Sequence, residues 1–298
     1  MYNIPILFIL FANPDTTAQV FERIRQVKPS KLYIAADAPR LDKQGEAQRC
    51  IETRNIIHRI DWNCEVKTLF QEKNLGPKIA VSTAITWFFE QEEMGVVLEH
   101  DCLPDPSFFP YCEELLVRYK DDNRIGHISG QNHFPGIVKN DLSYDFCSRV
   151  HIWGWASWRR VWKNYDVNFP FWEQHKDKRS FLFHNLWEEI YFSSFIPDVL
   201  KNKNGISTWD TQYYFTVRLQ NQLAIYPSVN LVTNIGIGDP NAVHTSKKKQ
   251  DPPVTEIKFP LIHPSDFLPN KIFDRKNQPF SYKRLGRWGL SKLFLSKF

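Results

Sequence analysis

Short apolar runs alternate with longer amphipathic or polar stretches through the first hundred residues, and this alternation constrains the fold more than any other feature. The apolar runs predict buried strands, at residues 4–11, 31–36, 65–70 and 95–98. The stretches between them predict helices, at residues 15–27, 43–59 and 78–90, with Asp15 as the cap of the first. Strands separated by helices form right-handed βαβ units and therefore a mostly parallel sheet. We expect an α/β fold in which helices flank this sheet.

The pattern is less regular after residue 101. Asp105 is a suitable cap and Pro106 suits a first turn, so a helix is predicted from there to Tyr119. Trp155, Trp158 and Trp162 recur at helical spacing, which predicts one buried helix face. Further strands are predicted at 125–129, 223–226 and 230–233, and further helices at 181–191 and 209–219. These patterns divide the chain into a first half, 1–130, a second half, 131–250, and an extension, 251–298.

The formal net charge of +5 is unevenly distributed along the chain. Residues 271–298 hold eight Lys and Arg against one acid, a net charge of +7, so the rest of the chain carries −2. A nearly neutral body argues against a nucleic-acid-binding protein, which needs a basic face. The basic segment also holds Trp288 and several Leu and Phe residues, which favours attachment to an anionic membrane surface. The alternatives are that this segment packs on the body or is disordered.

The cysteines point to a reducing compartment. Their number is five, which is odd, and no Cys-x-x-Cys pair occurs, so neither a zinc site nor a disulfide framework is predicted. The expected location is the cytoplasm, with peripheral attachment to the inner face of the membrane if the basic segment binds lipid. The early apolar run, residues 4–11, is too short to cross a bilayer and follows no basic residue, so we expect a strand rather than a signal peptide.

Two carboxylates follow the predicted strand at 95–98, in the sequence Glu99-His100-Asp101. Alternate residues of a strand point to the same face, so these carboxylates lie one pleat apart and point the same way. Carboxylate oxygens suit a divalent cation, and a bound diphosphate can supply further ligands. An ordinary pair of acids at a strand end is the simpler interpretation of this motif alone. The helix opening that follows, Asp105-Pro-Ser-Phe-Phe, favours the functional one.

With these elements the sequence resembles the nucleotide-sugar-dependent glycosyltransferases of the GT-A fold. It is similar to the N-acetylglucosaminyltransferase I type and to its bacterial relatives, the nucleotide-diphospho-sugar transferases. The resemblance covers residues 3–245 and implies a GT-A-like, Rossmann-related, mostly parallel sheet with an acceptor-side subregion. It implies a metal-dependent, inverting transfer of a sugar from a nucleotide diphosphate, with a UDP-sugar favoured over a GDP-sugar. The implied acceptor is a saccharide or lipid-linked saccharide, and the implied cofactor is Mn²⁺ or Mg²⁺.

The resemblance also implies roles for residues on the nucleotide side. Asp101 would hold the metal, and His244 would lie near the diphosphate and join the metal shell. Asp37 occupies the place of an Asp that reads the uracil edge. The full set with implied nucleotide-sugar contacts is Phe11, Asn13, Asp37, Lys78, Glu99 and His100. Relatives have Asp where His100 stands and Arg where Asn13 stands, so this chain lacks one expected cation and the identity of the sugar donor stays open.

Asp210 follows Trp209 at the start of a predicted helix. The commonest use of such an Asp is to cap the helix. The resemblance instead makes Asp210 the general base, which takes the proton from the acceptor hydroxyl as that oxygen attacks the anomeric carbon. Flat indole rings suit the faces of sugars, so the acceptor side is assigned to Trp153, Trp155 and Trp209.

Two other functions stay open from the sequence. One is a carbohydrate-binding protein with a decayed site, which His100 and Asn13 allow, although Asp101 and Asp210 speak against it. The other is a nucleotidyltransferase that makes the nucleotide-sugar itself. That enzyme needs a Gly-rich phosphate loop after the first strand, where this chain has Ala12-Asn13-Pro14.

Overall fold

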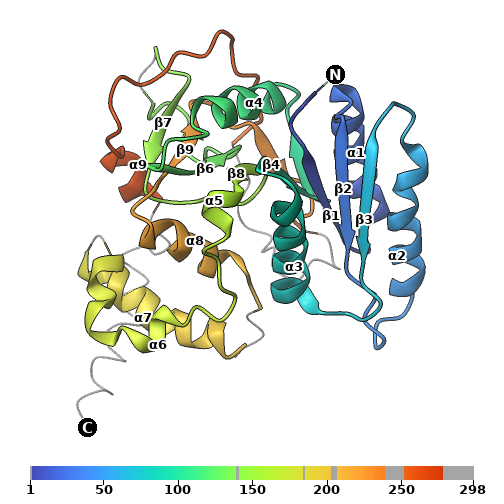
Figure 1. Ribbon diagram of the computed structural model, residues 1–298, viewed down its shortest axis with the longest axis horizontal. Coiled ribbons are helices and arrows are strands. Elements are labelled where there is room, and N and C mark those ends of the chain that lie inside the picture. The colour runs from blue at the N-terminus through green and yellow to red at the C-terminus, as the bar shows by residue number, and fades with distance from the viewer. Residues whose placement is uncertain (1, 139–140, 184, 203–206, 239–251, 278–298) are drawn as a thin grey trace.

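The main sheet has eight strands and helices on both faces (Figure 1). The computed structural model describes residues 2–138, 141–183, 185–202, 207–238 and 252–277. The strands of the main sheet, in spatial order, are β3 (Glu65–Phe70), β2 (Lys31–Ala36), β1 (Ile6–Leu10), β4 (Met94–Glu99), β8 (Trp155–Trp158), β6 (Ile125–Ser129), β9 (Leu223–Pro227) and β7 (Tyr144–Cys147). Only β8 and β7 run against the other six. The predicted α/β fold with a mostly parallel sheet is confirmed.

Helices connect most of these strands. They are α1 (Pro14–Val27), α2 (Glu46–Arg54), α3 (Gly76–Gln91), α4 (Phe108–Arg118), α5 (Arg159–Trp162), α6 (Phe171–Gln174), α7 (Leu186–Leu200), α8 (Asp210–Leu219) and α9 (Lys271–Lys276), with short 3-10 helices at Asn55–Arg59 and Lys176–Leu182. Two further strands, β5 (Cys102–Pro104) and β10 (Val232–Asn234), form a separate antiparallel ribbon. In the part of the chain that the structure describes, no helix has the length and apolar character needed to cross a membrane.

The chain changes direction across the sheet at β1. From β1 it moves outward through α1 to β2 and through α2 to β3, and α3 then carries it back to β4 on the other side of β1. Because such crossovers are right-handed, α1 and α2 cover one face of the sheet and α3 covers the other, as Figure 1 shows. The connections leaving β1 and β4 therefore diverge. A crevice for a ligand is expected at the carboxyl ends of these two strands.

The start of α1 differs from the prediction in its cap. Asn13, not Asp15, is the N-cap, and its side-chain oxygen accepts a hydrogen bond from the Thr16 amide at 3.2 Å. Asp15 lies in the first turn, where the helix dipole favours a negative charge. Ala12 has a left-handed backbone conformation (φ 39°) that turns the chain sharply after β1. This turn keeps Phe11 and Asn13 at the carboxyl end of the strand.

The Trp-rich segment is a strand where a helix was predicted. β8 lies between β4 and β6 in the middle of the sheet, and helices pack on both of its faces, so every residue from Trp155 to Trp158 is buried. The helical spacing of the tryptophans was misleading, because burial on both faces of a central strand removes any alternation. Trp162 is also buried, at the end of the one-turn helix α5.

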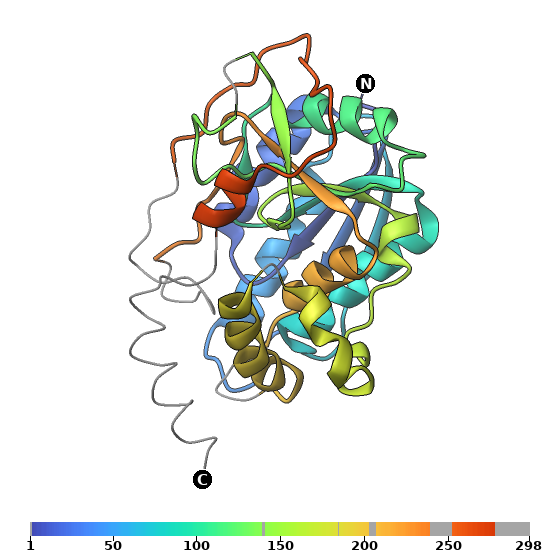
Figure 2. The same cartoon turned by 90° about the vertical axis from the view of Figure 1, so that its left-hand side faces the viewer.

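One hydrophobic core runs from Tyr2 to Leu261 and joins the first and second halves of the chain. The segment 252–277 then crosses the outer edge of β7. There the Ser143 amide donates to the Ile262 carbonyl at 3.0 Å, and the Asn270 amide donates to the Phe146 carbonyl at 2.8 Å. Figure 2 shows this segment along the β7 side of the molecule, ending in α9. Phe273 of α9 is fully buried and stacks on Tyr226, which holds the helix against the sheet.

Candidate functional site

A cavity of about 990 Å³ opens at the carboxyl ends of β1, β2 and β4, where the sheet topology places a crevice. The first half of the chain supplies part of its wall, and the segment before β8, α7, the start of α8 and the end of β10 supply much of the rest. The residues predicted for the site that line it are Phe11, Asn13, Asp37, Glu99, His100, Asp101, Trp153, Trp209 and Asp210. The fold therefore brings most of the predicted residues to one place.

Three carboxylates gather in this cavity. Burial, together with the negative charges of Asp101 and Asp210, raises the pKa of Glu99 to about 8. All three causes act in that direction, and no cation is among them. Among the described residues, the end of β4 and the start of α8 thus form an acidic cluster in which no cation lowers the pKa of Glu99.

The carboxylate of Asp101 is held by the β5–β10 ribbon. Asn234 donates from Nδ2 to Asp101 Oδ2 at 3.1 Å, and the Ile235 amide donates to the Asp101 carbonyl at 2.8 Å. Gly236 lies so close that a Cβ built on it would be 2.8 Å from Asp101 Oδ2. Sequence analysis missed this support, because it depends on pairing between β5 and β10.

The acidic cluster fits a divalent cation only if the substrate completes the coordination shell. Among the described residues, no group of three or more His, Cys, Asp or Glu side chains has the geometry of a complete metal site. Asp101 offers hard oxygen ligands of the type that Mg²⁺ and Mn²⁺ prefer. It lies close enough to Glu99 for its negative charge to help burial raise the pKa of Glu99. Mg²⁺ is commonly bound by one or two carboxylates together with substrate phosphates.

Asp210 is the first residue of α8 and is not the helix cap, a position taken by Trp209. Its Oδ1 accepts hydrogen bonds from the Thr208 hydroxyl and from the Thr211 amide, the latter at 2.8 Å. Within the described ranges, Oδ2 has no hydrogen-bond partner. The carboxylate is therefore oriented through one oxygen, while the other is available to a ligand in the cavity.

The loop after β2 contributes a cation, Arg40, which lies against the ring of Phe11 after β1. The guanidinium carbon of Arg40 lies 5.6 Å from the centroid of the Phe11 ring, and Arg40 is paired with the buried Glu46. Arg40 lines the cavity and was not predicted as a site residue. Arg40 lines the same cavity as Asn13, where the family resemblance implies an arginine.

Asp37 has a different environment from the one the resemblance implies. Its two oxygens accept hydrogen bonds from the amides of Ala38, Leu75 and Gly76 at 2.9 Å and from the Asn74 side chain at 3.1 Å. Burial raises the pKa of Asp37, and these amide hydrogen bonds oppose that shift. Its visible role is to hold the loop before α3 at the cavity wall.

Lys78 lies outside the cavity wall, which corrects its assignment to the nucleotide. Gly76 and Pro77 at the start of α3 do line the cavity. The buried ammonium of Lys78 points to the other side, where Nζ lies 3.4 Å from the Val199 carbonyl and 3.5 Å from Asn202 Oδ1. Burial lowers the pKa of this lysine. Lys78 satisfies the carboxyl end of α7, where a helix dipole favours a cation.

The three tryptophans assigned to the acceptor separate into two groups. Trp153 and Trp209 line the cavity. Trp155 is 0% exposed and stacks beneath Trp209, with ring centroids 5.9 Å apart. Assigning Trp155 to the acceptor was wrong, because its ring supports Trp209 from the core. His244, assigned to the metal, lies outside the described residues.

Two further groups in the cavity wall were missed by the sequence analysis. Arg149, on the loop between β7 and β8, is buried and pairs with Glu188 of α7. His151, two residues later, lies against the ring of His133 with centroids 5.0 Å apart. Neither forms a motif in the sequence, because their partners come from distant parts of the chain.

Comparisons with known proteins leave the family of this chain open. No protein-family model and no curated protein matches it. Among solved structures it is similar to HddC from Yersinia pseudotuberculosis, with a TM-score of 0.33 and 9% identity over 54% of this chain and 80% of that one. It is also similar to the inositol-1-phosphate CTP transferase from T. maritima, with a TM-score of 0.34 and 8% identity over 55% of this chain and 74% of that one. Likeness at this level carries no argument about activity.

Proposed function

We propose that this protein is a metal-dependent glycosyltransferase that uses a nucleotide-diphosphate sugar, with a UDP-sugar favoured. The acceptor would be a saccharide or lipid-linked saccharide, and the transfer would invert the anomeric centre. The observation that carries the proposal is the convergence of Asp101 and Asp210 on one cavity at the end of β4. A cavity of about 990 Å³ is large enough for a nucleotide-sugar.

The part of the cavity wall that comes from the first half of the chain suits the nucleotide. Phe11 offers a flat ring after β1, and Arg40, paired with Glu46, lies against that ring from the loop after β2. Asp101 would hold the divalent cation together with diphosphate oxygens, and Glu99 would stand beside it. When bound, such a cation acts as a Lewis acid and offsets the charge of the departing diphosphate.

The second half suits the acceptor. Asp210 is oriented through Oδ1, so its Oδ2 would accept the proton of the acceptor hydroxyl. Trp209 forms part of the wall directly beside it, and Trp153 lies on the same cavity. Trp209 is supported from below by Trp155, so its ring is fixed before a sugar arrives.

The test is to incubate the purified protein with a panel of UDP- and GDP-sugars, with and without Mn²⁺, and to measure nucleotide release. Release that requires the metal, and that is lost in Asp101→Asn, supports the proposal. Asp101→Asn keeps the hydrogen-bonding shape of the side chain and removes its charge. Nucleotide release that is equal in this variant and in the wild-type protein contradicts the role of Asp101.

A second set of substrates, nucleoside triphosphates with sugar 1-phosphates, separates the two alternatives. A nucleotidyltransferase would instead release pyrophosphate from a nucleoside triphosphate and a sugar 1-phosphate. A carbohydrate-binding protein would release nothing from either set of substrates.

A further inference from the structure

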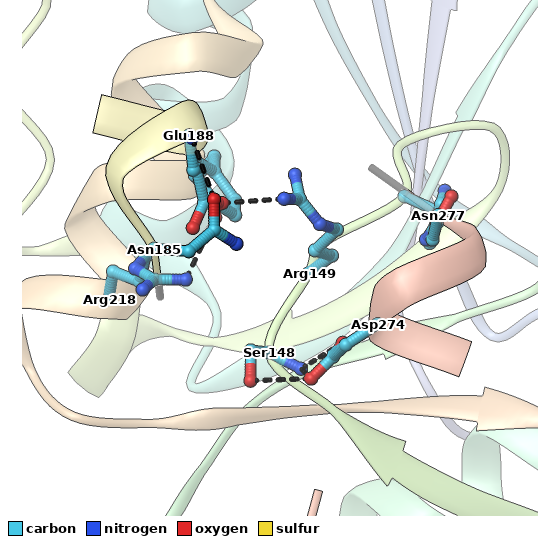
Figure 3. Close-up of polar contacts among 9 residues, drawn as sticks. Ser148, Arg149, Asn185, Glu188, Arg218, Asp274 and Asn277 are labelled. Atoms are coloured by element: carbon cyan, nitrogen blue, oxygen red, sulfur yellow. Dashed lines mark hydrogen bonds and ion pairs between the residues drawn. The ribbon is translucent and has the colours of Figure 1, made fainter. Parts of the chain in front are cut away.

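Arg149 is a buried cation in the cavity wall, on the loop between β7 and β8. Its side chain is 8% exposed. Nη2 donates a hydrogen bond to Glu188 Oε1 at 2.5 Å, and Figure 3 shows the side chain extending from the loop to Glu188 on α7. Nε is buried and, among the described residues, has no hydrogen-bond partner. A buried donor left without an acceptor costs about 1–3 kcal/mol, so it calls for an explanation.

Glu188 satisfies only part of this guanidinium. The same oxygen, Glu188 Oε1, also accepts a hydrogen bond from the Tyr214 hydroxyl at 3.2 Å. Tyr214 lines the cavity as well, and the Arg149 guanidinium carbon lies 5.7 Å from the centroid of its ring. An arginine carries five N–H donors in a fixed plane. One shared carboxylate oxygen leaves another donor of this guanidinium, Nε, without an acceptor among the described residues.

The loop that carries Arg149 is held on its other side by α9. The Ser148 amide donates to Asp274 Oδ1 at 3.0 Å, and its hydroxyl donates to Asp274 Oδ2 at 2.9 Å. Asn277, which directly follows α9 and lines the cavity, contacts the His151 ring. The loop is thus tied to two helices, and Arg149 is in place before a ligand binds. A preorganised group of this kind lowers the entropic cost of binding.

The cavity therefore holds two distinct polar regions. One is the acidic cluster of Glu99, Asp101 and Asp210, and the other is the Arg149–Glu188 pair, in which the guanidinium shares one carboxylate oxygen with the Tyr214 hydroxyl. Arginine is suited to carboxylate and phosphate groups, because its planar donors bind two oxygens at once. We propose that Arg149 forms a second anion subsite, which binds a phosphate or carboxylate group of the acceptor. Only the assignment to the acceptor rests on the proposed glycosyltransferase function.

The test measures binding of inorganic phosphate, and of glucuronate as a carboxylate probe, by calorimetry. Arg149→Gln is expected to weaken binding of both probes at least tenfold. Glu188→Gln is the matched control, because it breaks the same ion pair but removes the competing negative charge. We expect it to bind phosphate as tightly as the wild-type protein or more tightly. If Arg149 and Glu188 only stabilise the fold, both variants will lower the melting temperature alike and neither will change phosphate affinity, which overturns the proposal.

Arg149→Lys covers the case in which Arg149→Gln does not fold. It keeps the charge that pairs with Glu188 but loses the planar pair of donors. Phosphate binding several-fold weaker than wild type supports the subsite, and unchanged binding overturns it.

A second arm identifies the source of the anion. Phosphate that still binds in saturating UDP and Mn²⁺ belongs to the acceptor side. Displacement of phosphate by UDP, with an equal loss of UDP affinity in Arg149→Gln, would place the subsite on the sugar donor's diphosphate and overturn the assignment to the acceptor. These titrations need no transfer reaction. Phosphate binding through Arg149 without any nucleotide-sugar turnover would contradict the proposed function and leave the anion subsite standing.

Discussion

Asn234 donates a hydrogen bond to the carboxylate of Asp101, with Nδ2 and Oδ2 3.1 Å apart. Asn234 ends β10, and Asp101 precedes β5, so the pairing of these two strands brings the side chains together. Gly236 packs against the same carboxylate. The orientation of Asp101 is therefore set by the ribbon before any ligand binds.

Gly236→Ala should displace Asp101. A Cβ at this position would lie 2.8 Å from Asp101 Oδ2 and 3.0 Å from Asp101 Cβ, closer than such atoms approach. We expect Mn²⁺-dependent UDP affinity to fall about tenfold, since a metal ligand moved by even part of an ångström loses its geometry. Calorimetric titration of UDP with and without Mn²⁺ measures this.

Gly238→Ala is the matched control for that variant. It lies in the same loop and has a left-handed conformation (φ 90°), and no atom of the described residues lies within 4 Å of the added Cβ. It therefore adds backbone strain without touching Asp101. Equal losses of affinity in both variants would mean that the loop, rather than the position of Asp101, governs binding.

Asp210→Asn tests the general base. Asparagine still accepts the Thr211 amide hydrogen bond through its oxygen, but it cannot take up a proton. We expect the transfer rate to fall at least about 10²-fold, with little change in affinity for the sugar donor. Thr208→Val, which removes the hydroxyl that donates to Oδ1, should cost only a few-fold in rate. Near-normal turnover of Asp210→Asn would leave Asp210 as an ordinary acidic residue of the first helical turn.

The sequence predicts the first half of the fold well. There the spacing of the apolar residues and the positions of the turn residues indicate the same strands and helices that the tertiary contacts stabilise. The strands predicted at 31–36, 65–70 and 125–129 have the same bounds as β2, β3 and β6. The prediction fails where neighbouring strands, rather than the local sequence, determine the secondary structure. β8 is a strand because β4 and β6 lie on either side of it, and β5 and β7 are too short to show a period.

The site follows the same division. Glu99 and Asp101 were predictable, because ligands bind at the carboxyl ends of the strands in open α/β sheets of many different proteins. Trp153 and Trp155 could not be told apart, because Gly154, at a left-handed φ of 66°, turns the chain between them. Arg149 depends on Glu188 of α7, and no local pattern connects the two.

His127 should make the fold sensitive to acid. It lies on β6 with a fully buried ring, and burial lowers its pKa to about 3, against about 6.5 for an unfolded chain. Between these values the unfolded state binds a proton that the folded state does not. The free energy of unfolding should therefore be highest above pH 6.5 and fall toward pH 3, by up to about 1.4 kcal/mol per pH unit from this residue.

Urea unfolding of the wild-type protein and of His127→Gln, at pH 7, 6, 5 and 4, measures this contribution. The variant should be less stable at pH 7 but lose less stability between pH 6 and 4. His58→Gln, at an exposed position, is the matched control. An identical pH slope in His127→Gln and the wild-type protein would assign the acid sensitivity to other groups.

Residues 278–298 of the basic segment 271–298, which lie outside the described residues, should bring the cavity to an anionic membrane. The chain enters this segment directly after Asn277, which lines the cavity, and Leu268 and Ile272 nearby are 70% and 60% exposed. Each basic residue near an anionic leaflet contributes about 1 kcal/mol, and salt weakens that attraction. We expect the full chain to co-sediment with vesicles that contain phosphatidylserine, less so in high salt and not with neutral vesicles. The matched control is a chain that ends at Asn277. It keeps α9, which packs on the sheet, and should stay in solution. Sedimentation of both chains, or of neither, would exclude a membrane role for this segment.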